Sequence, residues 1–267
     1  MSNILNDRFS KAEPITKGWS EDKKYCVTNQ DGTKLLLRLS SADKYEHRKC
    51  LHDMMARVSA LGVPMCRSVE LGTCNEGVFS LQNWIDGEDL EDILPLLPET
   101  EQYAFGLQSG EILRKIHSIP VPVRQEDWAI RFNRKADTKL QKYRECGIRF
   151  DGDWRVIEYL EQNRKLLDDR PQCFQHGDYH VGNMMLENGE LKIIDFDRYD
   201  FGDPWEEFNR IVWSASVSPH FATGQLRGYF GGEPPLEFSS FSLFTSQATH
   251  WAQYTGRFRS VRMKLTP

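Results

Sequence analysis

The pattern of apolar and polar positions changes near residue 84 of the chain. Before it, apolar runs of strand length predominate: YCVT and LLLRLS flank Asp31-Gly32, a hairpin signal, and VFSLQNWI predicts a further strand. Between these strands, apolar residues recur every three or four positions over about residues 43–60, which predicts a helix. We therefore expect a small, mostly β lobe at the start of the chain.

After residue 84 the pattern becomes mostly helical. Thr100 is the expected N-cap of a helix that Pro120 ends, and a second helix is expected over residues 154–167. An Asn188-Gly189 pair between MML and LKII predicts a β-hairpin inside this helical part. These elements predict a large, mainly helical second lobe.

The predicted hairpin brings three polar side chains together. If Glu187 pairs with Glu190, the register carries Asn183 and Asp195 to the same open end of the ribbon. Asp178 lies five residues before Asn183, on the loop that leads in. Two carboxylates and a carboxamide then share one rim, and oxygen ligands of this kind suit Mg²⁺.

Composition narrows the class of protein. The chain has 267 residues, 27% charged and 39% hydrophobic, which is typical of a globular protein with a sizeable core. A net charge of −5 and a pI near 5.9 argue against nucleic-acid binding and mildly favour a cationic ligand. No apolar run approaches the ~20 residues that span a membrane, and no signal-peptide pattern is present. The six scattered cysteines, without a CxxC pair, lead us to expect reduced thiols in the cytoplasm.

The polar loop matches a known catalytic pattern. Protein kinases carry H-R-D-x-x-x-x-N, followed by a metal-binding Asp in D-F-G. This chain reads HGDYHVGN and then IIDFD, with the same Asp-to-Asn spacing. Gly177 replaces the Arg and Asp197 replaces the last Gly, and no APE segment follows. These departures argue against a regulated protein kinase.

The same motifs resemble the aminoglycoside phosphotransferase family, which is related to the choline kinases. HGDYHVGN, IIDFD and DPWEEF look like its catalytic loop, metal motif and following helix; GEILRKIHSIP, KGWSEDKKY and LLLRLS also match, so the resemblance covers about residues 14–238. It implies an α+β, two-lobed protein-kinase-like fold. A nucleotide-binding N-lobe would occupy residues 1–84, and a catalytic and acceptor-binding C-lobe residues 85–238.

The resemblance also implies an activity. It is that of a small-molecule phosphotransferase that moves the γ-phosphoryl group of ATP or GTP to a hydroxyl of a cationic acceptor, an aminoglycoside by default. A kinase of another small metabolite (a sugar, an amino alcohol or a macrolide) is the first alternative. A nucleotide-binding protein with impaired turnover is the second. A monomer is expected.

Roles for the loop residues follow from the resemblance. Asp178 would orient the acceptor hydroxyl and accept its proton, while Asn183 and Asp195 would hold Mg²⁺ on the nucleotide phosphates. We expect a bracing role for His176 and for Glu207. A zinc pair is disfavoured because no third ligand with suitable spacing follows.

In the N-lobe, Arg38 is the candidate cation for the α- and β-phosphates, in place of the usual lysine. The kinase scheme requires an acidic partner on the following helix. Glu46 and Asp53 are both possible, and the sequence does not choose between them. Backbone N–H groups near Gly18 and Ser20 would contact phosphate.

The segment between the lobes would bind adenine. Asn83, Trp84 and Ile85 are expected to form the hinge, whose backbone would read the base. Trp84 could equally belong to the core.

The last part of the chain, residues 239–267, departs from the rest. It contains none of the 39 acidic residues, and helical periodicity is not evident. One choice of synonymous codons, read in a shifted frame, gives LYIASDTLGS and VYWAIPFGQNE, which look like the resembling family. Our hypothesis is therefore a frameshifted and poorly packed tail.

Overall fold

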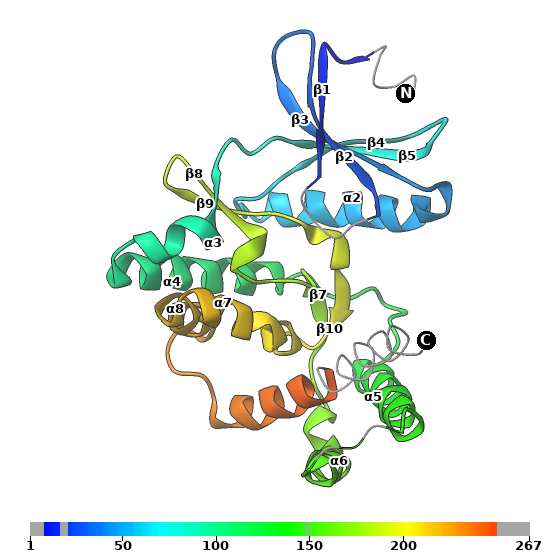
Figure 1. Ribbon diagram of the computed structural model, residues 1–267, viewed down its shortest axis with the longest axis vertical. Coiled ribbons are helices and arrows are strands. Elements are labelled where there is room, and N and C mark those ends of the chain that lie inside the picture. Colours follow the sequence, from blue (N-terminus) through cyan, green and yellow to red (C-terminus); the bar gives the residue numbers. More distant parts are fainter. Residues whose placement is uncertain (1–7, 17–20, 148, 150, 250–267) are drawn as a thin grey trace, which may run out of the picture.

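The computed structural model describes residues 8–16, 21–147, 149 and 151–249. Figure 1 shows two lobes, a strand-rich N-lobe and a helical C-lobe. The predicted phosphate contacts near Gly18 and Ser20 lie outside the described residues and stay predictions. No helix in the described part of the chain is both long and apolar enough to span a membrane.

The N-lobe is a five-stranded antiparallel sheet packed on one long helix. The strand order is β1-β2-β3-β5-β4, and the hairpin predicted at Asp31-Gly32 joins β2 to β3. The strands are β1 (Lys11–Ile15), β2 (Lys23–Thr28), β3 (Lys34–Ser40), β4 (Ser68–Cys74) and β5 (Gly77–Asn83). Helix α2 (Tyr45–Ala60) lies against this sheet and buries Leu51, Met55 and Val58, as the three-four spacing predicts.

The C-lobe is built from helices around two small sheets. The helices are α3 (Leu90–Ile93), α4 (Glu99–Ile116), α5 (Trp128–Glu145), α6 (Asp153–Gln162), α7 (Ile211–Val217) and α8 (Pro219–Phe230). The strands are β6 (Glu88–Asp89), β7 (Cys173–Gln175), β8 (Met184–Glu187), β9 (Glu190–Ile193) and β10 (Asp200–Gly202). Two sheets result, one with the order β6-β8-β9 and one pairing β7 with β10.

Two helix predictions for this lobe need correction. Helix α4 begins at Glu99, after Pro98, and no side chain caps it, so Thr100 is not the N-cap. Proline fits a helix start because its missing N–H would have had no partner there. Helix α5 was not predicted, although its buried residues recur every three or four positions; they are Trp128, Phe132, Ala136, Leu140 and Tyr143.

Helices α4 and α8 touch backbone to backbone. A Cβ atom on Gly106 or Gly110 of α4 would lie 2.2 Å or 2.1 Å from a carbonyl oxygen of α8. Gly224 and Gly228 of α8 face α4 in the same way, at 2.3 Å and 2.1 Å. Only glycine at these four positions allows the two helices to approach this closely.

The expectation of a poorly packed tail is wrong for residues 239–249. Residues 236–249 are helical, and this helix is drawn in orange to red in Figure 1. Its buried face carries Phe238, Phe241, Thr245 and Ala248, spaced three or four residues apart. The periodicity is easily overlooked because the apolar residues Leu236 and Leu243 lie on the exposed face, whereas the polar Thr245 is buried. The rest of the predicted tail lies outside the described residues.

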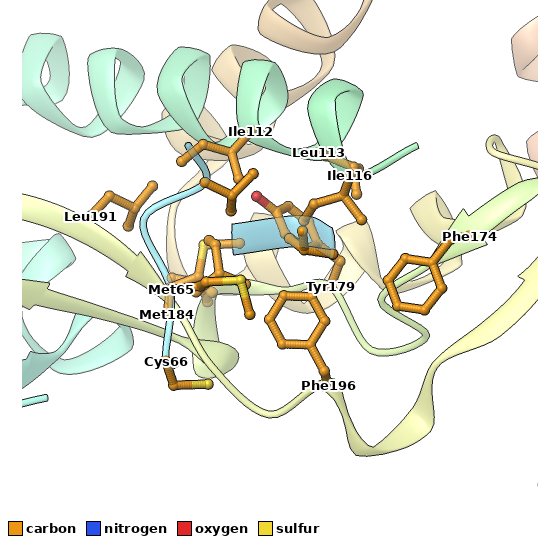
Figure 2. Packing of buried hydrophobic residues seen from close by; sticks show 14 of the residues in the cluster. Met65, Cys66, Ile112, Leu113, Ile116, Phe174, Tyr179, Met184, Leu191 and Phe196 are labelled. Carbon is orange, nitrogen blue, oxygen red and sulfur yellow. The ribbon is translucent and has the colours of Figure 1, made fainter. Parts of the chain in front are cut away.

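The largest apolar core joins the lobes beneath the catalytic segment. Figure 2 shows Met65 and Cys66, from the chain after α2, in one cluster with Ile112, Leu113 and Ile116 of α4. Tyr179 and Phe196 enter the same core from the two polar motifs. Backbone hydrogen bonds from Cys66 to Ile193 and from Ile193 to Pro64, both 3.0 Å, fix this chain to β9. The two polar motifs are therefore anchored in the core.

Candidate active site

The polar loop begins directly after the buried strand β7. His176 is fully buried there; its Nε2 lies 2.9 Å from the Ile194 carbonyl oxygen, and its Nδ1 lies 3.3 Å from the backbone nitrogen of Asp178. These contacts fit the tautomer with the proton on Nε2, donating to Ile194 and accepting from Asp178. His176 thus ties the loop carrying Asp178 to the strand leading to Asp195, in keeping with a bracing role.

Glu207 supports the same loop from below. Its carboxylate accepts hydrogen bonds from the backbone N–H of Gly177, at 3.0 and 3.1 Å, and from that of Tyr179, at 3.3 Å. His117, at the end of α4, lies 3.6 Å away. Burial alone would raise the pKa of Glu207, but His117, His176 and the Gly177 N–H outweigh it and lower the pKa. The side chain is therefore an ionised acceptor at neutral pH.

Gly177 explains one departure from the protein-kinase pattern. Its φ is +85°, and a Cβ atom there would lie 1.8 Å from the carbonyl oxygen of Arg198. A side chain at this position would force the two polar segments apart. The replacement of arginine by glycine thus goes with close contact between the loop and the segment after Asp195.

Asn183 and Asp195 meet at the open end of the predicted hairpin. Glu187 pairs with Glu190, and the Ile194 N–H donates to the Asn183 carbonyl at 3.0 Å, as the register predicts. The Asn183 amide Nδ2 donates to the Asp178 carbonyl at 2.8 Å, so its Oδ1 is left for another partner. Asp195 is left-handed, with φ of +63° and ψ of +61°, a conformation that costs energy outside glycine.

The donor set at this rim fits a magnesium ion. Asp195 keeps 41% of its side chain exposed, and its hydrogen bond to Arg38 is long at 3.5 Å. Together with Asn183 Oδ1 it offers two oxygen donors, and Mg²⁺ typically takes few protein ligands and keeps waters. Among the described residues no group of three His, Cys, Asp or Glu side chains could hold a metal by itself.

Asp178 lies between three basic side chains. Its Oδ1 is 3.2 Å from Nε of Arg210 and 3.9 Å from Nε2 of His180, and its Oδ2 is 3.6 Å from Nη1 of Arg198. Burial lowers the pKa of His180 more than Asp178 raises it, so this imidazole is neutral at pH 7. The candidate base Asp178 thus forms ion pairs with two guanidinium groups, those of Arg198 and Arg210, and neither was predicted.

Arg38 is buried in a network of carboxylates. It is only 4% exposed, and its guanidinium forms ion pairs with Asp22 at 3.6 Å, with Asp195 at 3.5 Å and with Asp197. The expected helix partners are wrong, because Glu46 and Asp53 are both exposed on α2. They lie off the apolar stripe of that helix and face away from Arg38.

Helix α2 contributes a cation in place of the expected acid. Arg48, 5% exposed, binds Ser40 at 3.0 Å, Asp197 at 2.6 Å and also Asp22. Its position was readable, because residues 48, 51, 55 and 58 share one helix face, so a charged residue interrupts the apolar stripe. Asp22, before β2, had no such sequence signal.

Lys24 is a second cation on the face that carries Arg38. The two residues are directly paired across β2 and β3, so their side chains leave the sheet on the same side. Lys24 is half-buried, and within the described residues no ion pair involves it. Burial and then Arg38 lower its pKa. Its pairing with Arg38 makes Lys24 a second candidate cation for the nucleotide phosphates.

The predicted hinge connects β5 to the catalytic hairpin. The Asn83 side chain accepts from the Arg67 N–H at 2.5 Å and donates to the Trp84 carbonyl at 3.3 Å. Ile85 is buried in the shared core, whereas Trp84 is half-buried. The Asp86 N–H donates to Glu187 of β8 at 2.8 Å.

Several solved structures have a fold similar to that of this chain. The ADP-bound aminoglycoside phosphotransferase APH(2'')-Ib is 15% identical, with 98% of this chain and 92% of that chain covered and a TM-score of 0.72. A thermostable mutant of the aminoglycoside phosphotransferase APH(4)-Ia is 17% identical, with 99% of this chain and 94% of that chain covered and a TM-score of 0.68. A choline/ethanolamine kinase family protein from Mesorhizobium loti is 16% identical, with 98% of this chain and 84% of that chain covered and a TM-score of 0.68. These likenesses confirm the two-lobed protein-kinase-like fold.

Sequence comparison assigns the family. Proteins of curated function give no significant match. The phosphotransferase enzyme family (APH) matches residues 11–238, which include both lobes and all the polar motifs described above. The chain therefore belongs to the phosphotransferase enzyme family.

Proposed function

We propose that this protein transfers the γ-phosphoryl group of ATP or GTP to a hydroxyl of a small molecule. The observation that supports it best is the meeting of Asp178, Asn183 and Asp195 at one rim below the sheet that carries Arg38 and Lys24. The ADP-bound state of APH(2'')-Ib supports a nucleotide as co-substrate. The hinge at residues 83–85 would bind the base.

Each residue has a role in the proposed transfer. Asp178 orients the acceptor hydroxyl, and its carboxylate takes the proton as the oxygen forms a bond to the γ-phosphorus. The bond from that phosphorus to the bridging oxygen breaks, and the nucleoside diphosphate leaves. Lys24 and Arg38 place positive charge beside the phosphates. A magnesium ion, held by Asn183 and Asp195, would neutralise charge on the phosphate oxygens.

Two classes of acceptor have support. An aminoglycoside, a cationic acceptor, is the candidate from the family resemblance, and APH(2'')-IIa, solved with gentamicin, has the same fold. Another small metabolite is the second candidate, supported by the choline/ethanolamine kinase neighbour and by the arginines beside Asp178. A binding protein without turnover was proposed for an unpacked tail, but residues 239–249 are packed.

Paired substitutions test the assignment of base and metal ligand. We expect Asp195→Ala to abolish Mg²⁺-dependent nucleotide binding, measured by calorimetry. Asp178→Ala should leave that binding intact and lower turnover by about 10²- to 10⁴-fold, the usual contribution of a general base. Asp86→Ala, whose side chain is 80% exposed, is the matched control. Near wild-type turnover in Asp178→Ala would show that the assignment of the base is wrong.

A further inference from the structure

The wall of the site beside Asp178 is basic. Arg198 contacts the carboxylate with one edge of its guanidinium group and keeps 58% of its side chain exposed. Arg210 contacts the other carboxylate oxygen, and its Cζ lies 4.7 Å from the ring centroid of Trp213, which is itself exposed. This stacking holds the Arg210 guanidinium in place beside Asp178. Asp178 thus faces two positive charges, Arg210 held by Trp213 and Arg198 on a largely exposed side chain.

Helix α5 carries further cations of the C-lobe. Arg131, Lys135 and Lys139 are four residues apart and lie along one side of the helix. Burial, then Lys135 and also Arg210, outweigh Glu206 and lower the pKa of Lys139 to about 8. The Lys139 ammonium donates to the carbonyl oxygens of Ala248 and Thr249, both at 3.3 Å, at the end of the last described helix.

Carboxylates near this wall are already engaged. Asp200 pairs with Arg131 at 2.8 Å, and Glu206 accepts the indole N–H of Trp128 at 2.7 Å. Burial raises the pKa of Glu206, so its charge is disfavoured further. Glu91 of α3, beside Gly182, also has an interaction partner. In the described part of the chain, the basic partners of Asp178 are thus His180, Arg198 and Arg210.

The acceptor must lie against this wall if the proposed function holds. The nucleotide phosphates would occupy the side of Asp195, Arg38 and Lys24, below the N-lobe sheet. The hydroxyl would lie between those phosphates and Asp178, so the rest of the acceptor extends toward Arg198 and Arg210. Hydrogen bonding of the hydroxyl to Asp178 leaves Arg198 free to bind a second group.

We propose that the natural acceptor carries an anionic group, a carboxylate or a phosphate, close to the hydroxyl that receives the phosphoryl group. This inference rests on the proposed function and names the acceptor class for the same site. Guanidinium groups bind carboxylate and phosphate through paired N–H donors. A polycationic acceptor would instead bring its ammonium groups against Arg198 and Arg210, which repel them.

Matched acceptors test the proposal. One series is glycerate, glycerol 3-phosphate, glycerol and 3-amino-1,2-propanediol; the other is gluconate, glucose 6-phosphate, glucose and glucosamine. Kanamycin and ethanolamine serve as further cationic acceptors. Mg²⁺-dependent phosphorylation is followed with ATP and with GTP. We expect kcat/KM for an anionic member to exceed that of its neutral and cationic relatives by about tenfold, the scale for an ion pair at the largely exposed Arg198. Comparing carboxylate with phosphate members identifies which anion is preferred.

Variants of Arg198 connect the preference to the wall. Because this side chain is exposed, Arg198→Gln should fold normally and lower kcat/KM for the anionic acceptor by about tenfold, mainly through KM. Arg198→Lys should restore part of the loss, and Arg198→Glu should shift the preference toward cationic acceptors. Arg57→Gln, at an exposed arginine of α2, is the matched control.

The outcomes separate this proposal from the proposed function. Higher kcat/KM for cationic members, equal values within each series, or no phosphorylation of any anionic member would overturn the anionic acceptor. The same holds if Arg198→Glu leaves the preference unchanged. Slow hydrolysis of the nucleotide by water, abolished in Asp195→Ala, is measured in parallel. If that hydrolysis persists while the acceptor result fails, phosphoryl transfer stands and only the acceptor class is wrong; if both fail, the proposed function falls as well.

Discussion

Replacing Glu207 with glutamine tests whether the brace beneath Gly177 and Tyr179 sets the geometry of the catalytic loop. The substitution keeps the size of the side chain and removes its charge. One acceptor oxygen remains for the two backbone N–H groups, and the new NH₂ group points at donors. We expect a folded but less stable protein whose loop is displaced.

The contacts give the size of the effect. Hydrogen bonds to a charged acceptor contribute about 1.5–3 kcal/mol each and neutral ones about 0.5–1.5 kcal/mol. Glu207 accepts from two backbone N–H groups. Neutralising it should therefore lower the free energy of unfolding by roughly 2–3 kcal/mol. A loop displacement of about 1 Å can reduce kcat by about 10²-fold.

The penalty should depend on pH. Because the pKa of Glu207 is lowered in the folded protein, its stabilisation is complete above its ordinary pKa of 4.5 and is lost as the pH falls through the lower folded value. The difference between wild type and Glu207→Gln should thus be full at pH 7 and shrink only below about pH 4.

Denaturant unfolding at pH 7 and at pH values below about 4, with kcat and nucleotide Kd measured at pH 7, forms the assay. Nucleotide Kd should stay unchanged, since Glu207 lies under Asp178 and not under the phosphate side. Glu99→Gln, at a side chain that is 75% exposed, is the control. Our reasoning is refuted if Glu207→Gln matches Glu99→Gln in both stability and kcat.

Two further predictions concern the last described helix and the nucleotide side. Phe241 is 2% exposed and packs between Trp128 and Trp205. Phe241→Ala should therefore lower the free energy of unfolding by about 3–5 kcal/mol. Leu243→Ala, at a half-exposed position, should cost far less, and equal losses in urea melts would contradict burial of this helix. Lys24→Ala should raise the KM for nucleotide about tenfold, while Lys23→Ala, an exposed neighbour, should not; identical nucleotide KM values would exclude a phosphate role for Lys24.

The local parts of the site could be predicted from sequence. Asp178, Asn183 and Asp195 lie within a short loop and a hairpin whose register is set by Asn188-Gly189, so spacing alone places them. Apolar runs of strand length and helix periodicity likewise predict β2, β3, β5 and α2, whereas β1 and β4 were not predicted. These features depend on neighbours in the chain.

The charge network could not be predicted in the same way. The partners of Arg38 come from before β2 and from the segment after β9, and only folding brings them together. Arg48 was readable as a charge within an apolar stripe, yet the expected Lys–Glu scheme directed attention to Glu46 and Asp53. The arginines beside Asp178 also come from separate segments, so their effect on the acceptor emerges only in three dimensions.

The backbone contact between α4 and α8 connects four remote glycines to the loop that carries Asp178. The Gln225 amide of α8 donates to the Ser109 hydroxyl of α4 at 2.9 Å. The Tyr179 hydroxyl donates to the backbone carbonyl of the same Ser109 at 2.8 Å. Tyr179 directly follows Asp178, so the spacing of the two helices sets the depth of the base. Alanine usually favours a helix by about 1 kcal/mol over glycine. At these four positions, replacing glycine with alanine would instead push the helices apart and move Asp178. Active variants of this protein should therefore keep glycine there.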